Sequence, residues 1–188
     1  MDVSRVDFFR STPWLDEKTF EALFLEHYTM VYSVLFRMIG DRFEADDLAA
    51  EVFWRLWERP PARMENTGGW LYRVATRLGY NAIRDSRRRN QYETAATEAD
   101  PDGWRSDSQI DPALEAEQHQ DRERVRAVLR KLALRDVQAL VLRHSGCSYK
   151  EIAAALEVPA SSVGTLLSRA ETKFEALYRQ GEKDAPER

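Results

Sequence analysis

The chain has 188 residues, a formal net charge of −4 and an apolar share of 43%, values that allow one domain or two small ones with packed cores. The acidic balance excludes a protein that coats DNA unaided, because such a molecule is repelled by phosphate at long range. The single cysteine, Cys147, excludes an internal disulfide. Since no stretch reaches the length of a membrane span and the N-terminus lacks an apolar signal region, we expect a cytoplasmic protein without a membrane partner.

Two amphipathic helices are predicted in the first third of the chain. Apolar residues follow helical spacing from Phe20 onward, and Gly40 is a suitable C-cap for this first helix. Asp41 can cap a second helix, which stops before Pro60. His27 falls on the apolar stripe of the first helix, where a satisfied core histidine is a simpler interpretation than a ligand.

The second predicted helix carries acidic side chains next to an aromatic one. Asp46, Asp47 and Glu51 cluster near Trp54, which lies off the apolar face. Such a surface suits a basic protein partner. Two alternatives are an acidic first turn that complements the helix dipole, and three carboxylates that hold a divalent cation. The cation site lacks a paired histidine or a second acidic cluster.

A third helix, predicted over residues 69–89, combines an apolar stripe at positions 71–83 with a basic and aromatic face. That face is expected to point to solvent, and it carries Trp70, Arg73, Arg77, Tyr80, Asn81 and Arg84, followed by Arg87, Arg88 and Arg89. Cations attract phosphate and rings offer platforms for unstacked bases, so the face suits single-stranded or opening nucleic acid. A plain solvated helix face is the alternative. Gly68 and Gly69 are expected to free the backbone before this helix.

The composition changes after this helix. Residues 90–111 are rich in Asp, Glu, Pro, Gly and Ser, which predicts a flexible acidic linker whose simplest role is passive spacing.

Helical periodicity returns from residue 112. Ser148 and Glu151 form a capping box that begins a short helix, and a tight turn at Glu157 leads to a last helix with a polar outer face. This is the layout of a helix-turn-helix, whose last helix can enter a DNA major groove, with a plain three-helix bundle as the alternative. His144 and Cys147 are candidates for half of a metal site or for a redox sensor. A helix-end histidine and a buried thiol are the simpler interpretation.

Taken together, the two halves resemble the extracytoplasmic-function (ECF) group of the sigma-70 family of bacterial RNA polymerase initiation factors. The resemblance rests on EADDLAAEVFWRLW, GGWLYRVATRLGYNAIRDSRRR and YKEIAAALEVPASSVGTLLSRAETKF, and it covers about residues 18–180. It implies an all-α fold of two small helical domains joined by the flexible acidic linker. The implied parts are an N-terminal arm (1–17), the sigma region 2 bundle (18–89), the linker (90–111), the region 4 helix-turn-helix (112–180) and a polar tail (181–188).

The resemblance also implies which residues meet which partner. Those that would bind the clamp of core RNA polymerase are Asp46, Asp47, Leu48, Glu51, Phe53 and Trp57. Those that would recognise and melt the minus-ten promoter element are Asn66, Thr67, Trp70, Arg73, Arg77, Tyr80, Asn81, Arg84, Arg87 and Arg88. Those that would meet the minus-thirty-five element are Ser161, Ser162, Thr165, Ser168, Arg169 and Lys173.

The partners implied are core RNA polymerase, through its clamp and flap, promoter DNA, and an anti-sigma factor or other regulator. No cofactor, metal or catalytic residue is implied. The chain departs from the family pattern at three places. Arg77 and Asn81 stand where Asn and Asp are common, basic residues of the last helix become Gly164 and Leu166, and Glu157 occupies a turn position where glycine is frequent.

Two other function classes compete with this interpretation. A stand-alone helix-turn-helix regulator explains residues 112–180 but not the first three helices. A metal-dependent nuclease would use Asp46, Asp47 and Glu51, but the sequence has no phosphate-loop glycine pattern and no nucleophile motif.

Overall fold

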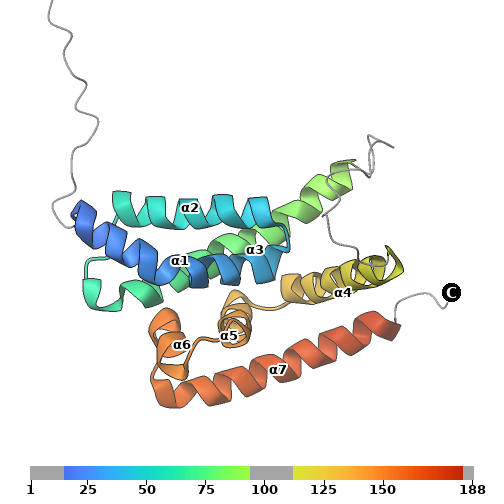
Figure 1. Ribbon diagram of the computed structural model, residues 1–188. Coiled ribbons are helices and arrows are strands. Elements are labelled where there is room, and N and C mark those ends of the chain that lie inside the picture. Colours follow the sequence, from blue (N-terminus) through green and yellow to red (C-terminus); the bar gives the residue numbers. More distant parts are fainter. Residues whose placement is uncertain (1–14, 94–111, 184–188) are drawn as a thin grey trace, which may run out of the picture.

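Every regular element in the described part of this computed structural model, residues 15–93 and 112–183, is a helix, which confirms the all-α class. Figure 1 shows the helices, which are α1 (Glu17–Ile39), α2 (Arg42–Glu58), the short 3-10 helix η1 (Met64–Asn66), α3 (Thr67–Glu93), α4 (Pro112–Lys131), α5 (Leu134–His144), α6 (Tyr149–Leu156) and α7 (Ala160–Lys183). The predicted arm up to residue 14, linker residues 94–111 and tail residues 184–188 lie outside the described residues.

The helix ends follow the local signals in the sequence. The Asp41 side chain accepts a hydrogen bond of 2.8 Å from the Glu44 backbone N–H, as predicted for an N-cap. Gly40 ends α1 in the left-handed region, with φ of 76°. Ser148 and Glu151 form both hydrogen bonds of the predicted capping box at the start of α6.

The first three helices share a core of fully buried side chains that includes Leu35, Met38, Leu56 and Leu71. Helices α1 and α3 are in contact at Gly79, where a Cβ would lie 2.8 Å from the Met38 sulfur. Glycine here leaves space for the buried Met38 side chain, which a larger residue would displace. Helix α2 packs on both α1 and α3 (Figure 1).

The second half of the chain packs directly against the first. Helices α5 and α6 lie between α3 and α7 (Figure 1), and both contact α3 as well as α7. Val137, Leu142, Ile152 and Val163 are fully buried and form the centre of this half. The buried residues of the two halves form one continuous cluster.

The two glycines before the third predicted helix have a different role from the one expected. Gly68 and Gly69 lie inside α3, which runs from Thr67 to Glu93 rather than from 69 to 89. A Cβ at Gly69 would lie 2.9 Å from the Ala154 carbonyl carbon of α6, so this glycine permits helix contact. Backbone freedom was the wrong explanation, because the contact comes from a residue far along the chain.

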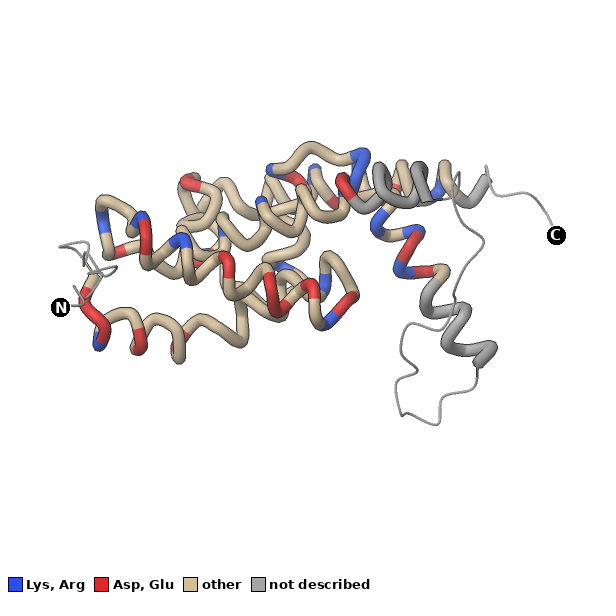
Figure 2. Tube along the Cα trace, turned by 90° about the horizontal axis from the view of Figure 1, so that it is seen from above, with Lys and Arg blue, Asp and Glu red and all other residues tan. Residues whose placement is uncertain are grey.

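Charged positions of both signs are spread along the helices rather than gathered at one end (Figure 2). Among the helices of the described part, none combines the length and the apolarity needed to cross a bilayer.

We expect Leu35→Ala to lower the free energy of unfolding by about 2–5 kcal/mol, because it leaves a cavity in a fully buried position. The matched control is Leu25→Ala on the same helix, where the side chain is 72% exposed and the change should stay within about 0.5 kcal/mol. Urea unfolding followed by circular dichroism measures both. Equal effects of the two substitutions would contradict this packing.

Candidate nucleic-acid interface

The basic face of α3 is exposed only in part. Arg77, Asn81 and Arg84 are exposed, and the Arg84 guanidinium lies 5.7 Å from the centre of the Tyr80 ring. Arg87 and Arg88 belong to α3 but lie outside the residues whose side chains are described. Arg77, Asn81 and Arg84 therefore form a cationic, solvent-facing strip in the middle of this helix.

The prediction that Tyr80 faces solvent is wrong. Its side chain is 8% exposed, and its hydroxyl donates a hydrogen bond of 2.9 Å to the Leu132 carbonyl at the end of α4. One turn earlier, the buried Thr76 hydroxyl accepts a 2.9 Å hydrogen bond from the Gln138 amide of α5. The second half of the chain covers this part of α3, which helical periodicity within α3 cannot reveal.

Arg73 and Asn66 are turned toward the end of α6 rather than toward open solvent. The Arg73 guanidinium donates to the carbonyls of Ala155 at 2.6 Å and Ala154 at 3.3 Å, and it pairs with the Glu157 carboxylate at 2.7 Å. The Asn66 amide also donates to the Ala154 carbonyl, at 3.1 Å. A helix leaves its last carbonyls without intrahelical partners, so these side chains cap α6 from outside.

Two other residues predicted to meet the minus-ten element are partly or fully buried. Thr67 is buried, and its hydroxyl donates to the Met64 carbonyl at 2.7 Å, which joins η1 to α3. Trp70 is half-buried and packs against the core.

Helix α2 lies on the far side of α1 and α3 from α7 (Figure 1), and it carries exposed acidic and aromatic side chains. Asp46 and Asp47 are exposed, whereas Phe53 is 2% exposed and packs between α1 and α2. Leu48 and Trp57 are half-buried, and Glu51 pairs with Arg55 at 2.5 Å. Of the six α2 positions predicted for polymerase binding, Phe53 therefore supports the core in this conformation.

Two large exposed side chains of α2 were absent from that predicted set. Phe43 is 62% exposed and Trp54 is 57% exposed. The position of Trp54 off the apolar stripe indicates its exposure from the sequence. Phe43 lies in the first turn after the N-cap, before the stripe begins, so the stripe gives no such indication for it. Both lie on the helix that also carries the exposed carboxylates of Asp46 and Asp47.

Asp46 is tied to the neighbouring helix. The Tyr28 hydroxyl of α1 donates to its carboxylate, and this hydrogen bond, with burial adding to it, raises the pKa of Tyr28 to about 12. Asp47, which has no such role among the described contacts, is the better position at which to test partner binding.

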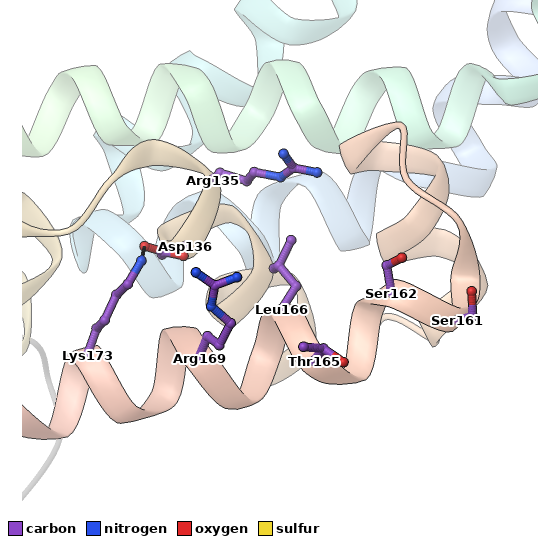
Figure 3. Close-up of a pocket in the computed structure, with 8 residues that line it drawn as sticks. All are labelled: Arg135, Asp136, Ser161, Ser162, Thr165, Leu166, Arg169 and Lys173. Carbon is purple, nitrogen blue, oxygen red and sulfur yellow. Dashed lines mark hydrogen bonds and ion pairs between the residues drawn. The ribbon is translucent and has the colours of Figure 1, made fainter.

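A groove of about 470 Å³ lies between the start of α5 and the outer face of α7 (Figure 3). The residues that line it are Arg135, Asp136, Ser161, Ser162, Thr165, Leu166, Arg169 and Lys173. The Lys173 ammonium pairs with Asp136 at 2.5 Å, while the Arg169 guanidinium is exposed beside the same groove (Figure 3). Ser168 is also exposed on α7.

The predicted residues of α7 are therefore brought together on one side of the helix, and α5 adds two more. The sequence pattern does not indicate that Arg135 and Asp136 border this groove, since they precede the helix-turn-helix pattern by a whole helix. Hydroxyl groups beside guanidinium groups can donate to phosphates and to base edges, which is the chemistry of a major-groove contact.

His27 and Cys147 have structural roles. The His27 ring lies 3.1 Å from the Tyr72 hydroxyl, which confirms a satisfied, half-buried histidine. Cys147 is buried, and burial, with the nearby Glu151 charge adding to it, raises the pKa of its thiol to about 11. No group of three or more His, Cys, Asp or Glu in the described ranges is arranged to hold a metal ion.

Family models match both halves of the chain. The model for sigma-70 region 2 matches residues 23–89, and the model for sigma-70 region 4 matches residues 122–174. The first match contains α2 and the basic face of α3, and the second contains the groove on α7. The chain therefore belongs to the sigma-70 family.

Curated relatives carry names from the same group. The chain is 30% identical over 152 residues to "Probable ECF RNA polymerase sigma factor SigI" of Mycobacterium tuberculosis, an alignment that covers 79% of this chain and 51% of the relative. It is 31% identical over 155 residues to "ECF RNA polymerase sigma factor SigE" of Mycolicibacterium smegmatis, with 80% and 57% covered. The chain thus spans about half the length of these relatives.

A solved structure is also similar in outline. It is the sigma factor RpoE in complex with the anti-sigma factor NepR from Bartonella quintana, at 17% identity, with 86% of this chain and 98% of that chain covered and a TM-score of 0.49.

Because burial and a neighbouring carboxylate raise the pKa of Cys147, we expect slow alkylation of the native protein by iodoacetamide. A thiol with a pKa of about 11 holds about a hundredfold less thiolate at pH 8 than an exposed cysteine. Below that pKa the thiolate fraction, and with it the alkylation rate, rises about tenfold for each pH unit. Mass spectrometry of the native and urea-unfolded chain measures both rates, and equal rates would refute the burial of Cys147.

Proposed function

We propose that the chain is an extracytoplasmic-function sigma factor, a dissociable specificity subunit of bacterial RNA polymerase without catalysis of its own. The observation that carries the proposal is the order of sigma-70 region 2 followed by region 4 in one chain, each with an exposed helix face of suitable chemistry. Because core polymerase works in the bacterial cytoplasm, the chain acts there as well.

Helix α2 is the polymerase-binding element in this proposal. Its exposed carboxylates, Asp46 and Asp47, complement a basic partner surface, and the exposed rings of Phe43 and Trp54 supply apolar contact area. Aromatic anchors beside charged groups are typical of residues that dominate binding free energy.

Helix α3 is the element that captures unpaired bases at the minus-ten element. Arg77, Asn81 and Arg84 already face solvent, and stacking of a base on an aromatic ring contributes about 1–3 kcal/mol. This is comparable to the cost of unstacking a base pair step, so binding of flipped bases can drive strand opening without hydrolysis. The presence of Arg77 and Asn81, where Asn and Asp are common, implies a particular minus-ten preference.

Helix α7 is the element that recognises the minus-thirty-five duplex. Ser161, Ser162, Thr165 and Arg169 share its exposed side, and Arg135 of α5 borders the same groove. With Gly164 and Leu166 in place of basic residues, Arg169 and Arg135 supply most of the positive charge there. Lys173 is held by Asp136 and can contribute to phosphate binding only when that pair opens.

The first experiment mixes the purified chain with bacterial core RNA polymerase, measures co-elution by size exclusion, and sequences transcripts made from a promoter library. Co-elution with transcripts from a shared promoter pattern supports the proposal. DNA binding without co-elution would replace it with a stand-alone helix-turn-helix regulator, which leaves the acidic surface of α2 without a role.

We expect the double substitution Asp47→Ala and Trp54→Ala to weaken binding to core polymerase at least tenfold, because it removes an exposed charge and an exposed aromatic anchor. Thermal stability should change little, since both side chains are exposed. The control, Glu21→Ala with Leu25→Ala, removes an exposed carboxylate and a large exposed apolar side chain from α1. Titration with labelled core measures the affinity, and an unchanged affinity would exclude α2 as the binding helix.

We expect Arg84→Ala, Arg87→Ala and Arg88→Ala together to reduce open-complex formation about tenfold or more while core binding is retained, because three cations next to the strand are lost. Permanganate footprinting of unpaired thymines measures opening. The control removes three positive charges elsewhere, with Arg122→Ala, Arg124→Ala and Arg179→Ala. Loss of core binding in the first variant, or equal loss of opening in both, would contradict the assignment of α3.

A further inference from the structure

The cations that line the groove on α7 are not equivalent. Arg135 and Arg169 are exposed beside it. The Lys173 ammonium instead lies 2.5 Å from a carboxylate oxygen of Asp136. Figure 3 shows the Lys173 side chain extending from α7 to Asp136 in the first turn of α5. Part of the positive charge that α7 carries on this side is therefore already neutralised within the chain.

We propose that Asp136 is a positioning residue of the duplex-binding surface. It withholds Lys173 from phosphate, and so keeps the affinity of the free chain for DNA of any sequence low. This inference rests on the proposed function of α7 as the helix that enters the major groove. It adds a residue of α5 that touches no DNA and acts only through Lys173.

The pair is held mainly by the burial of its acidic member. The Asp136 side chain is 12% exposed, whereas that of Lys173 is 50% exposed. Moving Lys173 onto a phosphate leaves the Asp136 charge removed from water and without its cation, which is unfavourable. The phosphate contact that is gained in exchange is solvent-exposed and screened by salt. The balance therefore favours the pair when α7 meets the backbone of a duplex.

The position of Asp136 in the helix adds to this preference. It lies in the first turn of α5, where the helix dipole stabilises a negative charge. The two partners come from different helices, which places the carboxylate in the wall of the groove rather than on α7. Rotation of the Lys173 side chain alone therefore cannot carry the carboxylate away from the groove.

The withheld cation affects one part of DNA binding more than the other. Contacts to phosphate supply the sequence-independent affinity, and contacts to base edges supply the specificity. Three cations and one carboxylate line the groove, a net charge of +2. A chain with fewer available cations leaves non-promoter DNA more readily and stays free for polymerase, because such sites greatly outnumber promoters.

The size of the effect follows from counterion release. Each phosphate neutralised by a cation steepens the plot of log affinity against log salt by about 0.9. One further contact corresponds to about threefold to tenfold in affinity near 0.1 M salt. Release of Lys173 should therefore make the slope steeper by about 0.9 and raise the affinity for random duplex by about that factor.

The test measures binding of the full chain to a fluorescein-labelled duplex of about 30 base pairs and random sequence, between about 50 and 200 mM salt. Asp136→Asn removes the charge and keeps the shape, and we expect the steeper slope and the tighter binding. The matched control is Asp121→Asn, which removes an exposed carboxylate paired with Arg124 of α4, outside the groove. This control makes the same change in net charge and should behave like the parent.

A double-mutant cycle shows whether Asp136 acts through Lys173. In the double variant Asp136→Asn with Lys173→Gln, the released ammonium is absent, so the gain in slope should disappear. Lys173→Gln alone completes the cycle. A general disturbance of α5 would alter binding in the presence and absence of Lys173 alike. Asp136→Ser supplies a second neutral form with a different shape and the same expected slope, and circular dichroism verifies that each variant is folded.

The outcomes separate this inference from the proposed function. Equal slopes for the parent, Asp136→Asn and Asp136→Ser would overturn the inference, and so would a gain that persists without Lys173. Failure of all these forms to bind the random duplex at the lowest salt would overturn it as well. Co-elution with core polymerase does not involve Asp136. Its absence in every form would overturn the sigma-factor proposal, whatever the slopes.

Discussion

The close contact between α1 and α3 at Gly79 is the constraint on which the rest of the molecule depends. A Cβ there would lie 2.8 Å from the Met38 sulfur and 3.4 Å from Leu35 Cδ2. Because Gly79 has no side chain, the Met38 and Leu35 side chains of α1 pack directly on the α3 backbone, and the apolar stripe of α3 is sealed. Helix α2 closes the other side of α1 and α3, which leaves its carboxylates outside. The positions of the basic and acidic surfaces are therefore consequences of this packing.

Different forces act within the halves and at the hydrogen-bonded attachments between them. Each half is centred on fully buried aliphatic side chains, such as Leu56 in one and Leu142 in the other, whose transfer to water is unfavourable. At α6 the apolar contact is supplemented by Arg73 and Asn66 donating to carbonyls. Water can replace such hydrogen bonds, so each contributes only about 1–3 kcal/mol net.

The elements that the sequence predicts well are those whose signals are local. The caps at Asp41 and Ser148 and the long apolar stripe of α1 depend on residues within a few turns of one another. The errors at Tyr80 and Gly69 have one shared cause, since their environments are set by Leu132 and Ala154, which lie far along the chain. The burial of Phe53 has a related cause. Its position in a motif suggested a partner, but the aromatic rings of α1 occupy its surface. Periodicity shows which face of a helix is apolar, not what covers the polar face.

Glu157 is one of the three departures from the family pattern, and its carboxylate also pairs with Arg73 where α6 meets α3. Its φ of 54° is a left-handed conformation that costs a residue with a Cβ about 1 kcal/mol or more relative to glycine. The ion pair with Arg73 is exposed on the glutamate side, and such pairs contribute only about 0–1 kcal/mol. Stability of the turn alone therefore favours glycine. A carboxylate at this position has a further effect, because it holds the Arg73 guanidinium at the end of α6. The residue that is unfavourable for the turn is thus favourable for keeping α6 on α3.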